Sequence, residues 1–290
     1  MDREGAVEAL YGRTSPCRIC PRQCGARRAE GELGDCRIGW EPVVSSAFPH
    51  FGEEAPLVGR GGSGTIFLAG CNLLCVFCQN SEISHGQEGD PVSVEEVAET
   101  MLNLERRGCH NVNFVTPTHV SAPLAAAVLR ARKRGLRVPI VYNCGGYESV
   151  ETLRLLEGFV EIYMPDFKFA FPEEAEAYAH APDYPEAARA AFKEMHRQVG
   201  DLVIRNGLAQ GGLLVRHLVM PGGALSSRRI LDFLADEISP RTYVNVMPQY
   251  RPSFQAFALE AINRRPTRRE YSEVRDYALF RGLRLDARNL

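Results

Sequence analysis

Seven of the nine cysteines of this chain fall into two short groups, and this clustering constrains the fold more than any other feature of the sequence. The two groups are Cys17, Cys20, Cys24 and Cys36, and Cys71, Cys75 and Cys78. The N-terminal stretch 1–5 has no apolar core, so we expect no secretory signal and a cytoplasmic location, where thiols stay reduced. Cysteine clusters in such a chain indicate metal or iron–sulfur ligation rather than disulfides.

Composition excludes several classes of function. The chain has 290 residues, of which 45% are hydrophobic and 24% charged, which is typical of a globular protein with a sizeable core. Its net charge of −2 argues against broad electrostatic binding to nucleic acid. No apolar run approaches the roughly 20 residues that a membrane-spanning helix needs. We therefore expect neither a nucleic-acid partner nor a membrane partner.

From residue 65 onward, short apolar runs alternate with helical segments, which predicts an α/β fold with a parallel sheet. The expected strands are 65–69, 112–115, 137–142, 160–164, 213–219 and 243–247. The expected helices are 93–107, 123–134, 149–156, 173–199 with a break near 182–185, 226–235 and 267–280. Such a chain makes an open sheet or a partial barrel, and in both the chemistry gathers at the C-terminal ends of the strands.

The pattern also predicts three parts along the chain. Residues 1–62 show little periodicity and are expected to form a small cysteine-rich module held by a metal or an iron–sulfur cluster. Residues 63–250 contain the strand–helix alternation, and residues 251–290 are expected to form a helical extension that packs on the barrel.

The second cysteine group follows the first expected strand directly and has the spacing C-x3-C-x2-C. Three thiolates can hold three irons of a [4Fe–4S] cube and leave the fourth iron open to a substrate or cofactor. The alternatives are a zinc site with a remote fourth ligand, or three unrelated core cysteines. Three cysteines within eight residues of one strand-end loop make the last alternative the weakest.

This motif, with Phe77 at the aromatic position of C-x3-C-x-aromatic-C, resembles that of the radical S-adenosylmethionine (radical SAM) superfamily. The resemblance implies a partial (βα)6 TIM-like barrel, a [4Fe–4S] cluster on Cys71, Cys75 and Cys78, and S-adenosylmethionine bound at the open iron. It implies an oxidoreductase in which one electron, from a reductant such as flavodoxin or ferredoxin, cleaves the cofactor. The resulting 5′-deoxyadenosyl radical then abstracts hydrogen from a substrate.

Within that superfamily the chain looks most like the pyruvate formate-lyase activating enzymes, and among them the PflX-like proteins. The likeness rests on Cys78-Gln79-Asn80, Tyr142–Tyr147, Met164–Lys168 and Arg216–Gly222, all at the ends of expected strands. The chain lacks the Gly-Gly-Glu motif of these relatives, for which Thr116, Thr118 and His119 could substitute. It also lacks their histidine near the sixth strand, for which Gln249 could substitute. The resemblance implies that the cofactor contacts Phe77, Asn80, Thr116, Thr118, Asn143, Asp166, Lys168, Arg216 and Gln249.

The N-terminal cysteines have the spacing C-x2-C-x3-C-x11-C, which suits either zinc or an auxiliary iron–sulfur cluster. PflX-like proteins carry a similar segment, and we favour the cluster. Of the two remaining cysteines, Cys109 is interpreted as structural. Cys144 is interpreted as a small buried hydrophobe, with hydrogen-atom transfer or metal ligation as the alternative.

Two kinds of substrate are consistent with this resemblance. One is a glycyl radical enzyme, which the activating enzymes oxidise at a backbone glycine. The other is a different peptide, a cofactor precursor or a small metabolite. A non-catalytic iron–sulfur protein for electron transfer or redox sensing would explain the cysteines but not Lys168, Arg216 and Asn143. A zinc-stapled nucleic-acid binder is weaker still, because no basic stripe is present.

Overall fold

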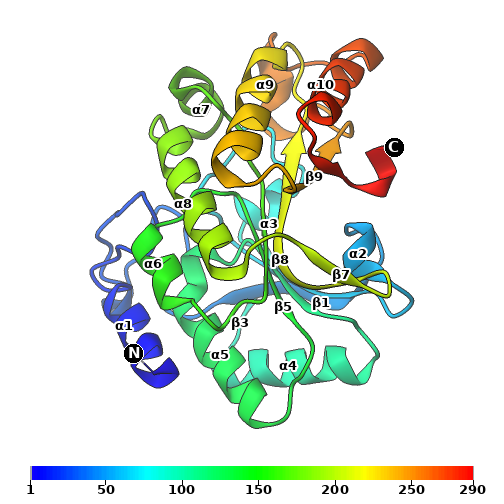
Figure 1. Cartoon of the computed structure of the whole chain (residues 1–290). Coiled ribbons are helices and arrows are strands. Elements are labelled where there is room, and N and C mark those ends of the chain that lie inside the picture. Colours follow the sequence, from blue (N-terminus) through cyan, green and yellow to red (C-terminus); the bar gives the residue numbers. More distant parts are fainter. Residues whose placement is uncertain (1, 290) are drawn as a thin grey trace.

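The computed structural model describes residues 2–289 and contains a mostly parallel sheet (Figure 1). Its parallel strands, in spatial order, are β10 (Arg284–Leu285), β9 (Tyr243–Met247), β8 (Leu208–Leu218), β6 (Ile162–Pro165), β5 (Ile140–Cys144), β4 (Val112–Val115) and β2 (Ser63–Leu68). The antiparallel strands β1 (Val43–His50) and β3 (Asp90–Pro91) extend the sheet beyond β2. A short strand β7 (Val203–Arg205) pairs with β8. The predicted α/β fold is confirmed.

The helices follow the strands as the alternation predicts. They are α4 (Val94–Arg106), α5 (Ser121–Lys133), α6 (Val150–Leu155), α7 (Pro172–Ala179), α8 (Tyr184–Val199), α9 (Ala224–Phe233) and α10 (Arg268–Phe280). The start of α4 shows how capping residues in the sequence determine where a helix begins. The Ser93 hydroxyl accepts the Glu96 N–H at 3.2 Å, and the Glu96 carboxylate accepts the Ser93 N–H at 2.7 Å, so the capping box satisfies both donors.

The N-terminal part is more closely joined to the sheet than the sequence indicated. Helix α1 (Arg3–Gly12) packs against α5 and α6 (Figure 1). Strand β1 pairs with β2, so the sheet crosses the boundary predicted at residue 62. Strand β1 was not predicted, because it contains Pro49 and a proline weakens any strand prediction. The cysteines from Cys17 to Cys36 lie in the irregular segment between α1 and β1.

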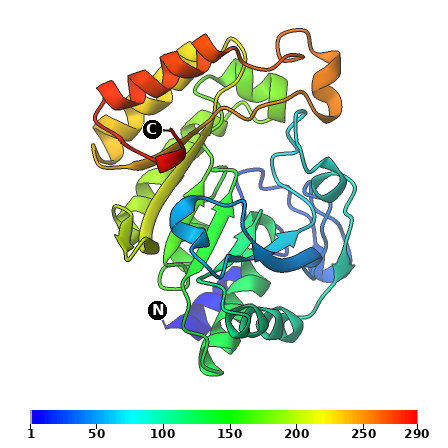
Figure 2. The same cartoon turned by 90° about the vertical axis from the view of Figure 1, so that its right-hand side faces the viewer.

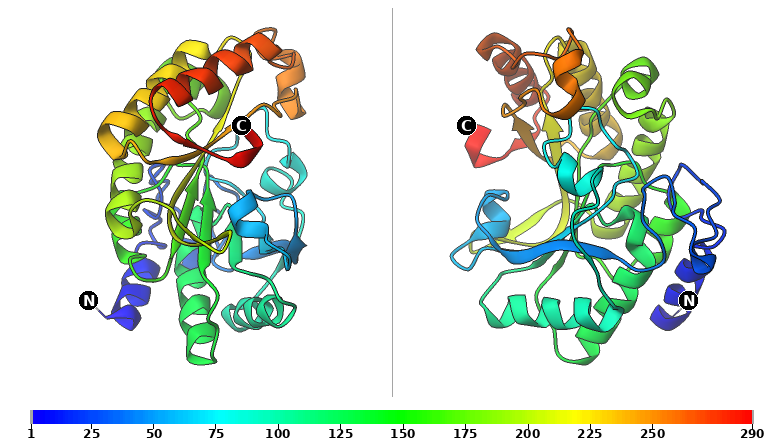
Figure 3. Two further views of the ribbon diagram at one scale, coloured as in Figure 1. Left: turned by 45° about the vertical axis from the view of Figure 1, so that its right-hand side comes forward. Right: turned by 180° about the vertical axis from the view of Figure 1, so that it is seen from behind.

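The described part of the C-terminal extension, residues 251–289, packs on the barrel and also extends it. Helix α10 lies along α9, as the two views of Figure 3 show, and β10 adds a parallel strand beside β9. Helices α1 and α10 lie toward opposite ends of the molecule (Figure 2). A short helix, α2 (Ala55–Val58), packs against β8 and so connects the β1 edge to the far side of the sheet. Within residues 2–289, no helix is both long and apolar enough to cross a membrane.

Candidate active site

The loop after β2 carries Cys71, Cys75 and Cys78, and all three line one cavity of about 230 Å³. Two of the three sulfurs accept hydrogen bonds. The Leu73 N–H donates to Cys71 Sγ at 3.4 Å, and the Ser84 hydroxyl donates to Cys78 Sγ at 3.1 Å. Donors of this kind stabilise sulfur that carries negative charge, as in a thiolate or a cluster ligand.

Burial raises the pKa of the Cys71 thiol and raises the pKa of Cys75 to about 12, although the nearby Lys168 lowers both. These thiols are therefore protonated at neutral pH until a metal displaces the proton. Within residues 2–289, no three His, Cys, Asp or Glu side chains are arranged to hold a single metal ion. The assignment of these cysteines to a cluster stays a prediction.

A network of charged residues forms the wall of the cavity opposite the cysteine loop. Asp166, just after β6, accepts hydrogen bonds from Lys168 Nζ at 2.6 Å and from Arg216 Nε at 2.7 Å. Arg216 Nη2 also donates to Asn143 Oδ1 at 2.7 Å, and all four residues line the cavity. Burial alone would raise the pKa of Asp166, but Arg216 and Lys168 outweigh it and hold that pKa below its usual range. Lys168 and Arg216 both line the cavity, where their remaining donors can pair with an anionic group.

Three further residues that the resemblance marks also line this cavity. Phe77 is buried, with its ring edge-on to Phe169 at a centroid distance of 6.1 Å. Thr116 has a positive φ of 61°, which is uncommon for a residue with a β-branched side chain. Asn80 lies exposed where helix α3 (Ser81–Ser84) begins.

Two of the marked residues, Thr118 and Gln249, do not line the cavity. The Thr118 hydroxyl is fully buried and donates to Glu148 Oε1 at 2.6 Å, because the chain turns into a short 3₁₀ helix directly after β4. Gln249 is exposed on the loop after β9. The sequence pattern correctly predicted that both residues follow a strand. It does not determine in which direction the side chain of a loop residue points.

The sequence analysis missed two carboxylates that approach this network from the segment before α2. Glu53 is buried, and its Oε2 lies 4.0 Å from Arg216 Nη1, while its Oε1 lies 3.4 Å from His50 Nδ1. Glu54 accepts a hydrogen bond from Asn245 Nδ2 on β9 at 2.9 Å. Two adjacent glutamates before a proline are typical of an exposed turn, so nothing local in the sequence indicated their burial.

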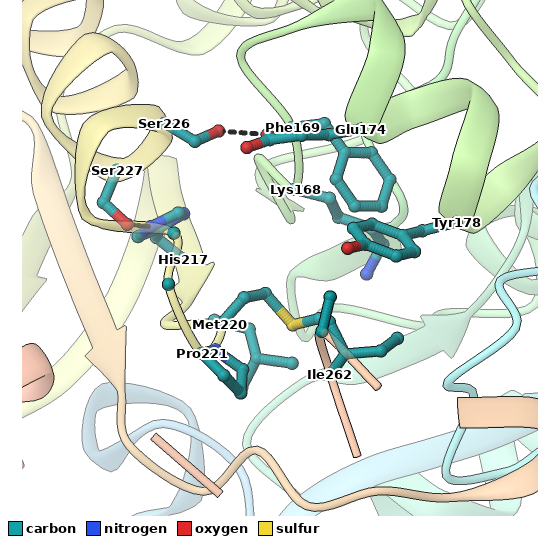
Figure 4. Close-up of a pocket in the computed structure, with 14 residues that line it drawn as sticks. Lys168, Phe169, Glu174, Tyr178, His217, Met220, Pro221, Ser226, Ser227 and Ile262 are labelled. Carbon is teal, nitrogen blue, oxygen red and sulfur yellow. Dashed lines mark hydrogen bonds between the residues drawn. The ribbon is translucent and has the colours of Figure 1, made fainter. Parts of the chain in front are cut away.

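A second cavity of about 240 Å³ adjoins the first and shares Lys168 and Leu218 with it (Figure 4). It lies between α7 and α9, and its polar wall includes Glu174, which accepts a hydrogen bond from the Ser226 hydroxyl at 2.6 Å. His217 also lines it, with Nε2 2.8 Å from the Ser227 hydroxyl. Lys168 therefore lies between the two cavities and lines both of them.

Cys144 ends β5 next to Asn143. Asn143 accepts a hydrogen bond from Arg216 in the cavity, and Cys144, which also lines the cavity, has its thiol in contact with the Glu148 carboxyl. Burial raises the pKa of Cys144 well above its usual value, and Glu148 raises it further. This placement favours the interpretation of Cys144 as a buried structural thiol.

The four N-terminal cysteines form a second group at the surface of the barrel. Cys17, Cys20 and Cys36 are buried, and Cys24 is partly exposed. Burial, together with the neighbouring thiols Cys36 and Cys17, raises the pKa of Cys20 to about 12. The sulfurs of Cys24 and Cys36 flank Gly34, since a Cβ there would lie 3.4 and 3.2 Å from them. The assignment of these four cysteines to a metal or an iron–sulfur cluster stays a prediction.

Arg22 ties this N-terminal segment to the Cys71 loop. Its guanidinium donates to the carbonyls of Asn72 and Leu73 on that loop, and to the carbonyls of Ala179 and His180 at the end of α7. Backbone carbonyls that accept from a charged donor form strong hydrogen bonds. Arg22 thus holds three segments that are distant in the sequence.

We expect Arg22→Met to lower the free energy of unfolding by about 2 kcal/mol, because hydrogen bonds from a charged donor are lost at partly buried carbonyls. Urea unfolding of the reconstituted protein measures this. Arg18→Met is the matched control, since Arg18 lies in the same segment with an exposed side chain. Equal stability of both variants would show that Arg22 does not hold the loop.

Comparison with known proteins adds three findings. The model of the "Radical SAM superfamily" matches residues 65–234. "Uncharacterized protein MJ0674" of Methanocaldococcus jannaschii is 34% identical over 275 residues, which cover 90% of this chain and 74% of that protein. The crystal structure of Streptococcus suis SuiB matches 74% of this chain with a TM-score of 0.47 and 13% identity, and SuiB bound to precursor peptide SuiA matches 75% with 0.48 and 11%. This chain spans 46% of the length of either SuiB chain.

Proposed function

This chain belongs to the radical SAM superfamily, and we propose that it is an enzyme that abstracts a hydrogen atom from its substrate. The observation that carries the proposal is that Cys71, Cys75 and Cys78 line the same cavity as Lys168 and Arg216. The [4Fe–4S] cluster and S-adenosylmethionine that this family implies supply, when bound, one electron and a carbon radical that removes hydrogen.

The donor atoms of the cysteine loop, three cysteine sulfurs, suit such a cluster. Three thiols supply one fewer protein ligand than a closed four-ligand site, which leaves one iron for a cofactor. The N–H of Leu73 and the hydroxyl of Ser84 already donate to two of the sulfurs. Lys168 lies near Cys75 and offsets part of the negative charge that three thiolates bring.

The charged wall fits the carboxylate of S-adenosylmethionine. Lys168 and Arg216 would bind it, while Asp166 holds both cations in place through its hydrogen bonds to each. Phe77, Asn80, Thr116 and Asn143 are proposed to contact the rest of the cofactor, since they line the same cavity. For Thr118 and Gln249 the structure offers no support for such a contact.

For the substrate, we propose a glycyl radical enzyme. The support is the likeness of the segments around Asn143, Lys168 and Arg216 to those of the activating enzymes. The test is anaerobic incubation of the reconstituted protein with S-adenosylmethionine, a reductant and a glycyl radical enzyme from the same genome. The proposal expects the EPR signal of a glycyl radical, and its absence with every such partner would reject this substrate.

A second candidate substrate is a different peptide or a small metabolite. The second cavity favours it, because a space of about 240 Å³ with both apolar and polar groups in its wall adjoins Lys168 and has room for a compact molecule. The missing Gly-Gly-Glu motif also separates this chain from the activating enzymes. A substrate-dependent increase in 5′-deoxyadenosine on addition of small metabolites, without a glycyl radical, would favour this candidate.

We further propose that Cys17, Cys20, Cys24 and Cys36 hold a second iron–sulfur cluster. Metal analysis of the variant in which Cys71, Cys75 and Cys78 are all alanine measures what the N-terminal group retains. We expect iron and sulfide without zinc. Zinc without iron would rule the second cluster out.

A further inference from the structure

The second cavity, between α7 and α9, has a carboxylate at one end and apolar side chains around much of the remaining wall. Glu174 and Ser226 form the polar end, as Figure 4 shows, and the apolar side chains include Phe169, Met220 and Ile262. The volume of about 240 Å³ leaves room for a compact molecule. Such a molecule would present one polar group to the carboxylate and an apolar body to the rest of the wall.

Glu174 is held in place by one neighbour and has no counter-charge. The Ser226 hydroxyl donates to Glu174 Oε2 at 2.6 Å, and the same hydroxyl accepts the Ala170 N–H at 3.0 Å. Within residues 2–289, no other side chain donates to this carboxylate, and no basic side chain lies within 4.0 Å of it. Burial raises the pKa of Glu174, and the neighbouring Glu173 raises it as well. A cation bound at this end of the cavity would therefore stabilise the ionised carboxylate.

The other ionisable groups of the wall already have partners. His217 Nδ1 lies 2.8 Å from the backbone oxygen of Phe167, and its Nε2 lies 2.8 Å from the Ser227 hydroxyl. Burial lowers the pKa of His217, so the ring stays neutral. Lys168 Nζ donates to Asp166 at 2.6 Å. Among the described residues of the wall, the carboxylate at the polar end is thus the charged group that lacks a partner of opposite charge.

From this arrangement we infer that the second cavity binds a compact primary amine, whose ammonium group pairs with Glu174 while its apolar body packs against the remaining wall. Ammonium and carboxylate groups form charge-assisted hydrogen bonds, which are stronger than neutral ones. The cavity adjoins the cysteine-lined cavity at Lys168 and Leu218, so the amine would lie beside the proposed cofactor site. The inference rests on the proposed radical SAM function and specifies the second candidate substrate as an amine.

The test measures the binding of 2-phenylethylamine to the reconstituted protein by anaerobic isothermal titration calorimetry at pH 7. Neutral 2-phenylethanol and anionic 3-phenylpropanoate carry the same ring on a chain of similar length. We expect the amine to bind at least about 10-fold more tightly than either, because it alone is a cation at this pH. Equal affinity for the three compounds, or no binding of the amine, would overturn the inference.

Glu174→Gln keeps the size of the side chain and removes its charge. We expect it to weaken the binding of 2-phenylethylamine by roughly 10- to 100-fold and to leave that of 2-phenylethanol unchanged. Glu173→Gln is the matched control, because Glu173 is the exposed neighbour on α7 and does not line the cavity. Equal losses in the two variants would overturn the site. If Glu174→Gln fails to fold, the comparison of the three compounds on the wild type still decides.

Competition separates this site from that of the cofactor. Saturating S-adenosylhomocysteine should not displace 2-phenylethylamine, and displacement would show that the cavity belongs to the cofactor and overturn the inference. Formation of 5′-deoxyadenosine with dithionite tests the proposed function separately, because the binding measurements need neither a reductant nor cleavage of S-adenosylmethionine.

Discussion

Asp166→Asn is expected to lower the free energy of unfolding at pH 7 by about 3 kcal/mol, because it leaves two nearly buried cations without their shared carboxylate. Lys168 Nζ and Arg216 Nε both donate to this residue, and their side chains are 17% and 18% exposed. The two cations would also lose their fixed orientation, so we expect binding of S-adenosylmethionine to weaken together with stability. Urea unfolding and equilibrium dialysis of the cofactor measure the two effects.

The pH dependence gives this prediction a second readout. The lowered pKa of Asp166 means that its contribution is fully present above the unfolded-state value of about 3.9 and is lost as the pH falls through the folded value. The difference between wild type and variant should therefore shrink in acid. Asp232→Asn is the control, since Asp232 also accepts from an arginine, Arg281, but at a more exposed site, where such pairs contribute about 1 kcal/mol or less. A loss as small as that of the control would contradict the assigned role of Asp166.

Glu148→Gln is expected to make the protein more stable than wild type at pH 8, by about 3 kcal/mol, and to change little near pH 4.5. Glu148 is buried, accepts hydrogen bonds from Thr118 and Tyr142, and has its pKa raised by burial from 4.5 to about 7. Between these two values the folded state keeps a proton that the unfolded state releases. Stability of the wild type should therefore fall as the pH rises through this range, and glutamine, which does not ionise, should remove the fall.

Urea unfolding at pH 5 and pH 8 measures this difference directly. Glu176→Gln serves as the control, because Glu176 lies exposed on α7 and such surface changes usually stay within about 0.5 kcal/mol. If the stabilities of wild type and Glu148→Gln changed in parallel with pH, the carboxyl would be ionised in the folded protein throughout. The assigned protonated state of Glu148 would then be wrong.

The strand–helix alternation could be predicted because it depends on local apolar patterns and capping residues. Strands β4 and β9 begin and end at the residues expected from the sequence, and the capping box of Ser93 and Glu96 begins α4 where a helix was expected. The strand–helix alternation also predicts that one cavity is lined by Asn143, Lys168 and Arg216. The carboxyl ends of parallel strands share one edge of the sheet, so polar residues that follow different strands come together there.

What the sequence could not predict depends on contacts between distant segments. Strand β1 forms because β2 offers it a partner, not because of its own pattern. Thr118 turns away from the cavity because Glu148, 30 residues later, accepts its hydroxyl. The burial of Glu53 against Arg216 and of Arg28 against Cys36 likewise depends on tertiary packing, and charged residues are rarely expected inside.

The central claim is that the Cys71, Cys75 and Cys78 loop supports reductive cleavage of S-adenosylmethionine. The most direct test is anaerobic reconstitution with iron and sulfide, addition of dithionite and S-adenosylmethionine, and quantification of 5′-deoxyadenosine. The variant with all three cysteines changed to alanine is the control. The account predicts product from the wild type alone. A wild-type protein with a full, reducible cluster that gave no product, and whose cluster EPR signal did not change on addition of S-adenosylmethionine, would contradict it.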